Sequence, residues 1–141
     1  MPSQRLAALL LGTLWSAGCV NTQTGAEETV TGTFVATILT VTLSGGSPVD
    51  ALAAGGSMHV TVNEDGTTSG SLSLPASVTG GAAVSLNLEG TAVITGLTVR
   101  FNTTADSFMR SVIFSRQSEL LLIADNQAVA GTAYTIALLR Q

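Results

Sequence analysis

The sequence predicts an all-β fold, an antiparallel up-and-down β-barrel of about eight strands, from three observations. Apolar and polar residues alternate with a period of two over most of the chain after residue 29, as in strands with one buried face. Gly, Asn and Asp interrupt the alternating segments at short intervals, as turns require. No sustained apolar stripe with a 3.6-residue period, the mark of a long helix, occurs after residue 29.

The first predicted strand is long, residues 30–43, and its alternation changes phase. Phe34, Ala36 and Ile38 share one parity, whereas Leu39 and Val41 have the other. Such a change within one strand predicts a β-bulge, which turns the later side chains to the other face. In the connection that follows, Ser47 before Pro48 predicts a short helical turn near residues 48–54.

The middle of the chain is predicted to consist of hairpins. Residues 58–62 and 71–74 alternate around a turn at residues 63–66, and Pro75 ends the second strand. Residues 84–88 form a further strand. Residues 91–95 and 97–102 then form a hairpin around Gly96.

Three more strands are predicted towards the end, at residues 108–114, 119–124 and 134–140, with a turn at Asp125 and Asn126. Short connections favour a meander, and pairing of its first and last strands removes both exposed edges. Two longer connections, residues 44–56 and 102–107, leave a Greek-key β-sandwich as the alternative.

Composition limits the function. Only 10% of the residues are charged, none is Lys, and the formal net charge is −4, which argues against nucleic acid as a partner. A single Cys excludes an internal disulfide and a Cys-based zinc site. The one His, His59, is expected on the solvent side of its strand, and Glu64 and Asp65 in a solvated turn. We therefore expect no enzyme activity, metal or cofactor.

Residues 1–18 have the layout of a secretory signal peptide: Arg5, an apolar run from Leu6 to Trp15, and small residues before Cys19. The placement of Cys19 resembles the lipobox of bacterial lipoproteins, although Ser16 stands where an aliphatic residue is usual. The resemblance implies lipidation at Cys19, a lipidated tether over residues 19–28 and a domain over residues 29–141. The alternative is an ordinary signal peptide that leaves Cys19 as a free thiol.

In lipoproteins an Asp after the Cys often marks retention in the inner membrane. Val20 occupies that position here. The expected location is therefore the cell envelope, at the outer membrane where one exists.

Gly32, Thr33 and Phe34 at the start and Arg140 near the end resemble the lipocalin (calycin) group. There a Gly-x-Trp motif lies on the first strand and an Arg from the chain's end packs across the Trp; Phe34 replaces the Trp here. The resemblance implies a barrel open at one end that binds a small apolar molecule, with Phe34 and Arg140 at the closure.

Arg110 is the candidate ligand-binding residue, because it shares strand parity with Phe108, Val112 and Phe114 and would meet a ligand carboxylate if that face is interior. The alternative is that its guanidinium reaches solvent from a strand end. For the whole protein, the alternative to ligand binding is a non-catalytic structural or protein-interaction β-domain on the cell envelope.

Overall fold

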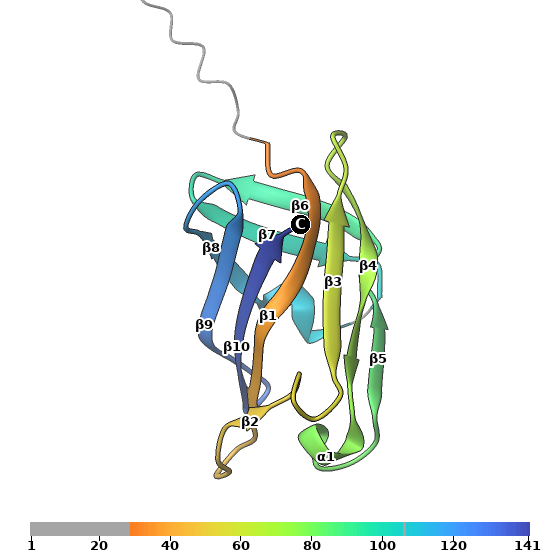
Figure 1. The fold of residues 1–141 in the computed structure, drawn as a ribbon, viewed down its shortest axis with the longest axis vertical. Coiled ribbons are helices and arrows are strands. Elements are labelled where there is room, and N and C mark those ends of the chain that lie inside the picture. Colours follow the sequence, from red (N-terminus) through yellow and green to blue (C-terminus); the bar gives the residue numbers. More distant parts are fainter. Residues whose placement is uncertain (1–28, 106) are drawn as a thin grey trace, which may run out of the picture.

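Pairing of the first strand with the last closes the sheet into a barrel (Figure 1). The structure is a computed structural model that describes residues 29–105 and 107–141. The predicted leader, Cys19 and the tether lie outside these described residues. Within them, the fold class predicted from the sequence is confirmed, and the single closed sheet excludes the sandwich.

Eight strands of the described chain follow one another around the ring, each antiparallel to its neighbours. Two short strands extend it: β2 (Val49–Asp50) pairs with the end of β1, and β5 (Val84–Asn87) pairs with the end of β4. The eight ring strands are β1 (Gly32–Thr42), β3 (Ser57–Val62), β4 (Thr67–Leu74), β6 (Gly90–Thr95), β7 (Thr98–Thr103), β8 (Ile113–Arg116), β9 (Leu121–Val129) and β10 (Thr132–Arg140).

The predicted bulge in β1 is present. The register between β1 and β10 shifts between Ala36 and Ile38. Phe34 and Ala36 are buried before the shift and Leu39 and Val41 after it, while Ile38 points outwards and is 49% exposed. The bulge therefore keeps both halves of a long apolar strand in the core and places one isoleucine on the outer surface.

A sharp corner separates β5 from β6. β4 pairs with β5 through residues 71–74 but with β6 only through Thr67 and Thr68. The buried Thr68 hydroxyl donates to the Leu88 carbonyl (2.9 Å) at this corner. Gly90 lies against the backbone of Asn102, where a β-carbon would collide. A glycine is needed here because the two backbones approach so closely.

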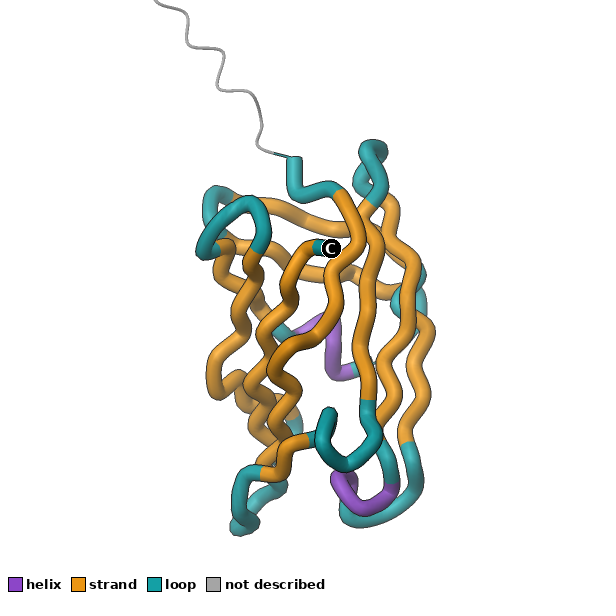
Figure 2. Tube along the Cα trace, viewed as in Figure 1, coloured by secondary structure: helices purple, strands orange, loops and turns teal. Residues whose placement is uncertain are grey.

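The described chain has two short helices (Figure 2). The helix α1 (Ala76–Thr79) follows Pro75 and ends at Gly80, whose φ of 70° is left-handed. The helical turn predicted near residues 48–54 is present as a single turn, in which the Ala54 N–H donates to the Asp50 carbonyl (3.2 Å). Val49 and Asp50 pair with β1, and residues 51–55 form a turn. The Asp50 carboxylate caps this turn by accepting from the Ala53 N–H (3.1 Å).

Two predicted elements in the last third are corrected. Residues 108–111 form the 3₁₀ helix η1 (Phe108–Ser111) and not the start of a strand, and β8 begins only at Ile113. Asp125 and Asn126 lie inside β9, where Asn126 has a φ of 45° and the register with β10 shifts. A bulge accommodates these turn-forming residues within the strand. The chain reverses instead at Ala130 and Gly131, both with positive φ.

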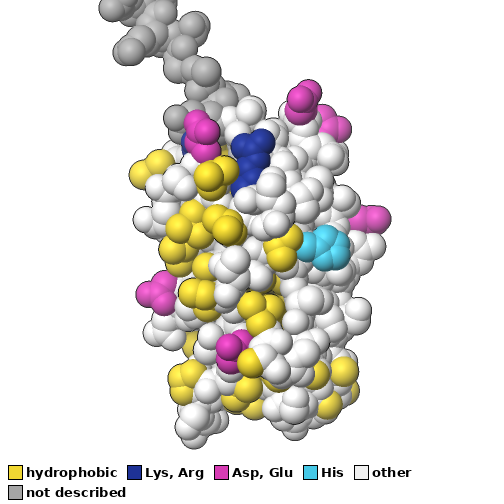
Figure 3. Space-filling model, viewed as in Figure 1, with side chains coloured by type: hydrophobic (Ala, Val, Ile, Leu, Met, Phe, Trp, Pro, Cys, Tyr) yellow, Lys and Arg dark blue, Asp and Glu magenta, His cyan; other side chains and the backbone are white. Residues whose placement is uncertain are grey.

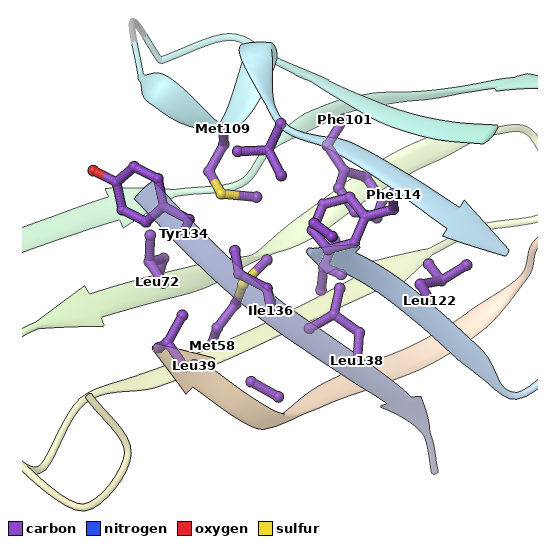
Figure 4. Packing of buried hydrophobic residues seen from close by; sticks show 14 of the residues in the cluster. Leu39, Met58, Leu72, Phe101, Met109, Phe114, Leu122, Tyr134, Ile136 and Leu138 are labelled. Carbon is purple, nitrogen blue, oxygen red and sulfur yellow. The ribbon is translucent and has the colours of Figure 1, made fainter. Parts of the chain in front are cut away.

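The barrel interior is filled by apolar side chains from all sides. In Figure 4, Leu39, Met58, Phe114, Ile136 and Leu138 point towards one another from four strands. The rings of Phe101 and Phe114 pack edge to face with centroids 5.3 Å apart. An eight-stranded barrel is just wide enough to be filled in this way. The centre of the barrel is therefore a packed core and not a ligand cavity.

The two ends of the barrel differ. At one end, where the chain enters β1 and β10 finishes, all eight strands pair in sequence (Figure 1). Towards the other end, β5 and the second half of β9 each pair on one side only among the described residues. The segment that carries η1 lies between β7 and β8 on this side. We call these the closed end and the open end.

Candidate functional site

A pocket of about 270 Å³ lies at the open end. It lies between the end of β1 and the start of β10 on one side and β4, α1 and β5 on the other, and η1 borders it. The lining residues are Val41, Leu43, Leu74, Thr79, Val84, Leu86, Ser107, Phe108, Thr132 and Tyr134. Its volume is near the lower end of the range for small-molecule sites, which fits a small ligand.

Among the described residues, the lining of this open-end pocket is apolar with a few hydroxyl groups and carries no formal charge. Two aromatic rings, those of Phe108 and Tyr134, stack almost parallel with centroids 4.2 Å apart. Burial raises the pKa of the Tyr134 phenol above its ordinary value, an effect partly opposed by a hydrogen bond with Thr132. The phenol is therefore neutral at physiological pH and offers one hydrogen-bond donor and acceptor in an apolar setting.

The strand pattern explains why this lining is apolar. On β5, Val84 and Leu86 point to the pocket, while Ser85 between them is exposed. α1 is anchored by the buried Val78, and Thr79 bridges its end by donating to the Ala82 carbonyl (2.7 Å). The inward positions that form the core elsewhere therefore line the pocket at the open end, where no strand covers them.

Arg110 does not lie in the barrel interior. It is exposed on η1, where its Nε donates to the Thr103 carbonyl (2.6 Å) and its Nη2 to the Thr104 carbonyl (2.9 Å). It borders a hollow on the outer surface of β6 and β7 together with Arg100. The expected interior strand face does not exist because residues 108–111 are helical. The side chain pins the η1 segment to β7 and does not line the open-end pocket.

Phe34 and Arg140 lie at the closed end. They are directly opposite each other in the β1–β10 ladder. Phe34 is fully buried and Arg140 is half-buried. The Arg140 side chain packs on Gly32, where an added β-carbon would be 2.6 Å from its Nε. The glycine, at a φ of 119°, therefore leaves the space in which the Cδ, Nε and Cζ atoms of the arginine cross the start of β1.

The remaining titratable candidates lie on the outside. His59 is exposed on β3, with its Nδ1 3.4 Å from the Ser71 hydroxyl. Asp65 accepts from the hydroxyl (2.6 Å) and the N–H (2.9 Å) of Thr67, and these bonds lower its pKa. Both belong to strand and turn structure away from the open-end pocket. Over residues 29–105 and 107–141, no three His, Cys, Asp or Glu side chains gather as metal ligands.

No helix in the described ranges is long and apolar enough to cross a membrane. Comparison of the chain with protein families, with characterised proteins and with solved structures finds no match. The closed antiparallel eight-stranded barrel is compatible with a lipocalin-like fold.

Sequence reasoning missed the residues that line the open-end pocket. Val84, Leu86 and Tyr134 follow the same apolar alternation as residues of the core, and only their place at the open end puts them in the pocket. Phe108 was assigned to a strand. The available signal was the length of the β4–β5 and β7–β8 connections, which marks where the barrel wall is incomplete.

Proposed function

We propose that the protein is a lipid-anchored envelope protein whose barrel binds a small, uncharged, apolar molecule in the open-end pocket. The observation that carries ligand binding is the pocket itself, about 270 Å³ of space lined by apolar side chains and neutral hydroxyls. Attachment through Cys19 rests on the sequence, namely the apolar leader and the small residues before the chain's single cysteine.

The ligand is expected to be uncharged because no described lining residue carries a charge with which it could pair. A buried carboxylate or ammonium without a partner is strongly disfavoured. Arg110, the residue expected from the sequence to meet a ligand carboxylate, is exposed outside the pocket with two carbonyl partners. A ligand with one hydroxyl or carbonyl group would find the Tyr134 phenol or the Ser107 hydroxyl.

Binding is tested with residues 20–141, which retain every strand of the ring, and a neutral fluorescent probe such as N-phenyl-1-naphthylamine. The probe should bind the parent chain. Filling the pocket with Val84→Trp should weaken binding at least tenfold, whereas Ser85→Trp, on the exposed face of the same strand, should leave it unchanged. Equal probe affinity in the two variants would contradict ligand binding at the open end.

Lipid attachment is tested on the full chain by mass spectrometry of the peptide that begins at Cys19. A diacylglyceryl modification on its sulfur is expected, together with recovery of the protein in the membrane fraction. An unmodified Cys19 thiol in the mature protein would contradict the anchor and leave the open-end pocket unaffected.

The second candidate function is a structural or protein-interaction module. The observation that favours it is the filled barrel centre, where Phe34, Phe101 and Phe114 are fully buried. The barrel would then present its outer surface to a protein, and the open-end pocket would be an unoccupied gap between loops. Failure of a panel of neutral apolar probes to bind the parent chain would favour this function.

A further inference from the structure

The outer surface of the barrel changes from apolar to polar along one row of residues that crosses the strands. The row runs through six consecutive strands, each residue directly opposite the next. Its members are Leu121, Leu139, Val35, His59, Ser71 and Asn87. The first three, on β9, β10 and β1, are apolar, and the last three, on β3, β4 and β5, are polar.

A second row of apolar residues crosses the same three strands, β1, β10 and β9. Ile38, Ala137 and Ile123 lie opposite one another on β1, β10 and β9. Ile38 is 49% exposed, Leu139 is 38% exposed, and Leu120 beside the first row is 53% exposed. Figure 3 shows hydrophobic side chains gathered over these strands. We call this surface the apolar face, defined by Val35, Ile38, Leu120, Leu121, Ile123 and Leu139.

The side chains of the apolar face point away from the core and are not needed to fill it. The outward positions of an antiparallel sheet are normally polar. Strands β3, β4 and β5 follow that rule, since Ser57, Ser73 and Ser85 form one outward row and Thr61 and Ser69 another. On β6, Val93 and Ile94 are exposed apolar residues as well. Strands β9, β10 and β1 also bury apolar inward faces, with Leu122 and Leu138 fully buried. Unlike β3, β4 and β5, they carry large aliphatic side chains on the outside as well. Exposed aliphatic side chains gathered on one outer face gain free energy when an apolar surface covers them.

The size of the apolar face argues against a stable dimer as its purpose. Two rows across three strands cover roughly 200–300 Å² at ordinary strand spacings. A stable protein–protein interface needs about 800 Å² from each partner. A face of this size therefore suits a weak contact that is made at high local concentration.

The apolar face lies close in sequence to the proposed lipid anchor, which would give it a high local concentration at the membrane. Val35 lies six residues after Thr29, near the start of β1, and Cys19 precedes Thr29 by ten residues. Ten residues reach at most ~35 Å when fully extended. A lipid on Cys19 would hold the start of β1 close to the bilayer surface. Short tethers of this kind give effective concentrations of about millimolar.

We propose that the apolar face rests on the lipid bilayer that carries the anchor, an inference that depends on the proposed lipidation of Cys19. The barrel then lies with its β9–β10–β1 side against the membrane near its closed end, and the open-end pocket is at the far end. The apolar face contains no Lys or Arg, so burial of aliphatic side chains, and not attraction to anionic lipid, drives the contact.

The test uses the full lipidated protein in phosphatidylcholine vesicles that contain brominated lipid. An environment-sensitive fluorophore is attached at Ile38→Cys or at Leu139→Cys, and at Thr61→Cys on the polar side as the matched control. In the lipidated protein the Cys19 sulfur is held in the thioether to the diacylglyceryl group and does not react with the label. Quenching by the brominated lipid should be several-fold stronger at positions 38 and 139 than at position 61, and partial replacement by phosphatidylglycerol should not increase it.

Equal quenching at all three positions in protein that floats with the vesicles would overturn the inference and leave the anchor intact. Disulfide-linked dimers of unlabelled Ile38→Cys, increasing with the protein-to-lipid ratio, would also overturn it in favour of a second copy as the partner. Failure of the parent protein to float would refute the anchor and this inference with it.

Discussion

The closed and open ends of the barrel are built from the same strands but differ in what covers their inward side chains. At the closed end, β1 and β10 pair through to Phe34 and Arg140, and the end of the arginine side chain crosses Gly32. At the open end, β5 lacks a second partner in the described chain, and inward residues such as Val84 and Leu86 line a pocket. An inward apolar residue thus stabilises the fold at one end and is available to a ligand at the other.

The largest expected effect is the loss of closure. Deleting residues 134–141 removes most of β10, together with the buried Tyr134, Ile136 and Leu138, and leaves β1 and β9 as open edges. Each buried aliphatic side chain contributes ~1.5–3 kcal/mol, so the total approaches the stability of a small domain. Thermal unfolding followed by circular dichroism should show no cooperative transition. Deletion of Gln141 alone is the control, and a truncated chain that melts near the parent temperature would refute closure by β10.

The next effect compares one phenylalanine at each end. Phe34→Ala should lower the free energy of unfolding by ~3–5 kcal/mol, because it empties a fully buried site. Phe108→Ala, at the half-buried rim of the open-end pocket, should cost clearly less but should abolish probe binding. Urea denaturation and probe titration of both variants measure the contrast. Similar losses of stability in the two variants would remove the distinction between the ends.

Arg140 should have a modest effect that separates packing from charge. Arg140→Ala is expected to lower stability by ~0.5–2 kcal/mol, since its Cδ, Nε and Cζ atoms cover Gly32 next to the Phe34 site. Arg140→Met keeps most of the stem and should recover most of the loss if packing dominates. A double-mutant cycle with Phe34→Leu should give a coupling energy above error. Strictly additive effects would show that Arg140 and Phe34 act independently.

The smallest effect concerns Tyr134, the chain's only tyrosine. Its pKa is raised above 10.0 in the folded barrel by burial, so the neutral phenol is favoured there relative to the unfolded chain. Its contribution to stability is therefore complete below pH ~10 and is lost as the pH rises through the raised pKa. Phenolate absorbance near 295 nm should titrate at higher pH in the folded than in the urea-unfolded protein. A common midpoint would contradict burial of the phenol.

Strand alternation was enough to predict the barrel, because each ring strand has one buried face and the register follows from that face. The change of phase in the apolar alternation near Ala36 and Ile38 also predicts the bulge that the structure contains. The errors lie where local and tertiary preferences compete. Phe108 and Val112 fit the alternation of a strand, yet residues 108–111 form the 3₁₀ helix η1 between β7 and β8. Asp125 and Asn126 favour a turn, yet pairing with β10 keeps them in β9.

The candidate site was less predictable than the fold. Inward residues of the core and of the open-end pocket have the same period and the same chemistry. Leu72 lies in the core and Leu86 lines the pocket. The difference arises because β5 has one strand partner in the described chain and because η1 lies beside it, and both are tertiary features. Arg110 was singled out by its charge within an apolar pattern, and that charge in fact serves two carbonyls on the outside.

The most direct test of ligand binding at the open end is a methyl NMR titration of residues 20–141 with N-phenyl-1-naphthylamine. Saturable shift changes are expected at Val41, Leu74, Val84 and Leu86, which line the open-end pocket. Val60, opposite Phe34 on β3, should not respond. Absence of saturable changes at the open end, or changes only on the outer surface, would contradict the account.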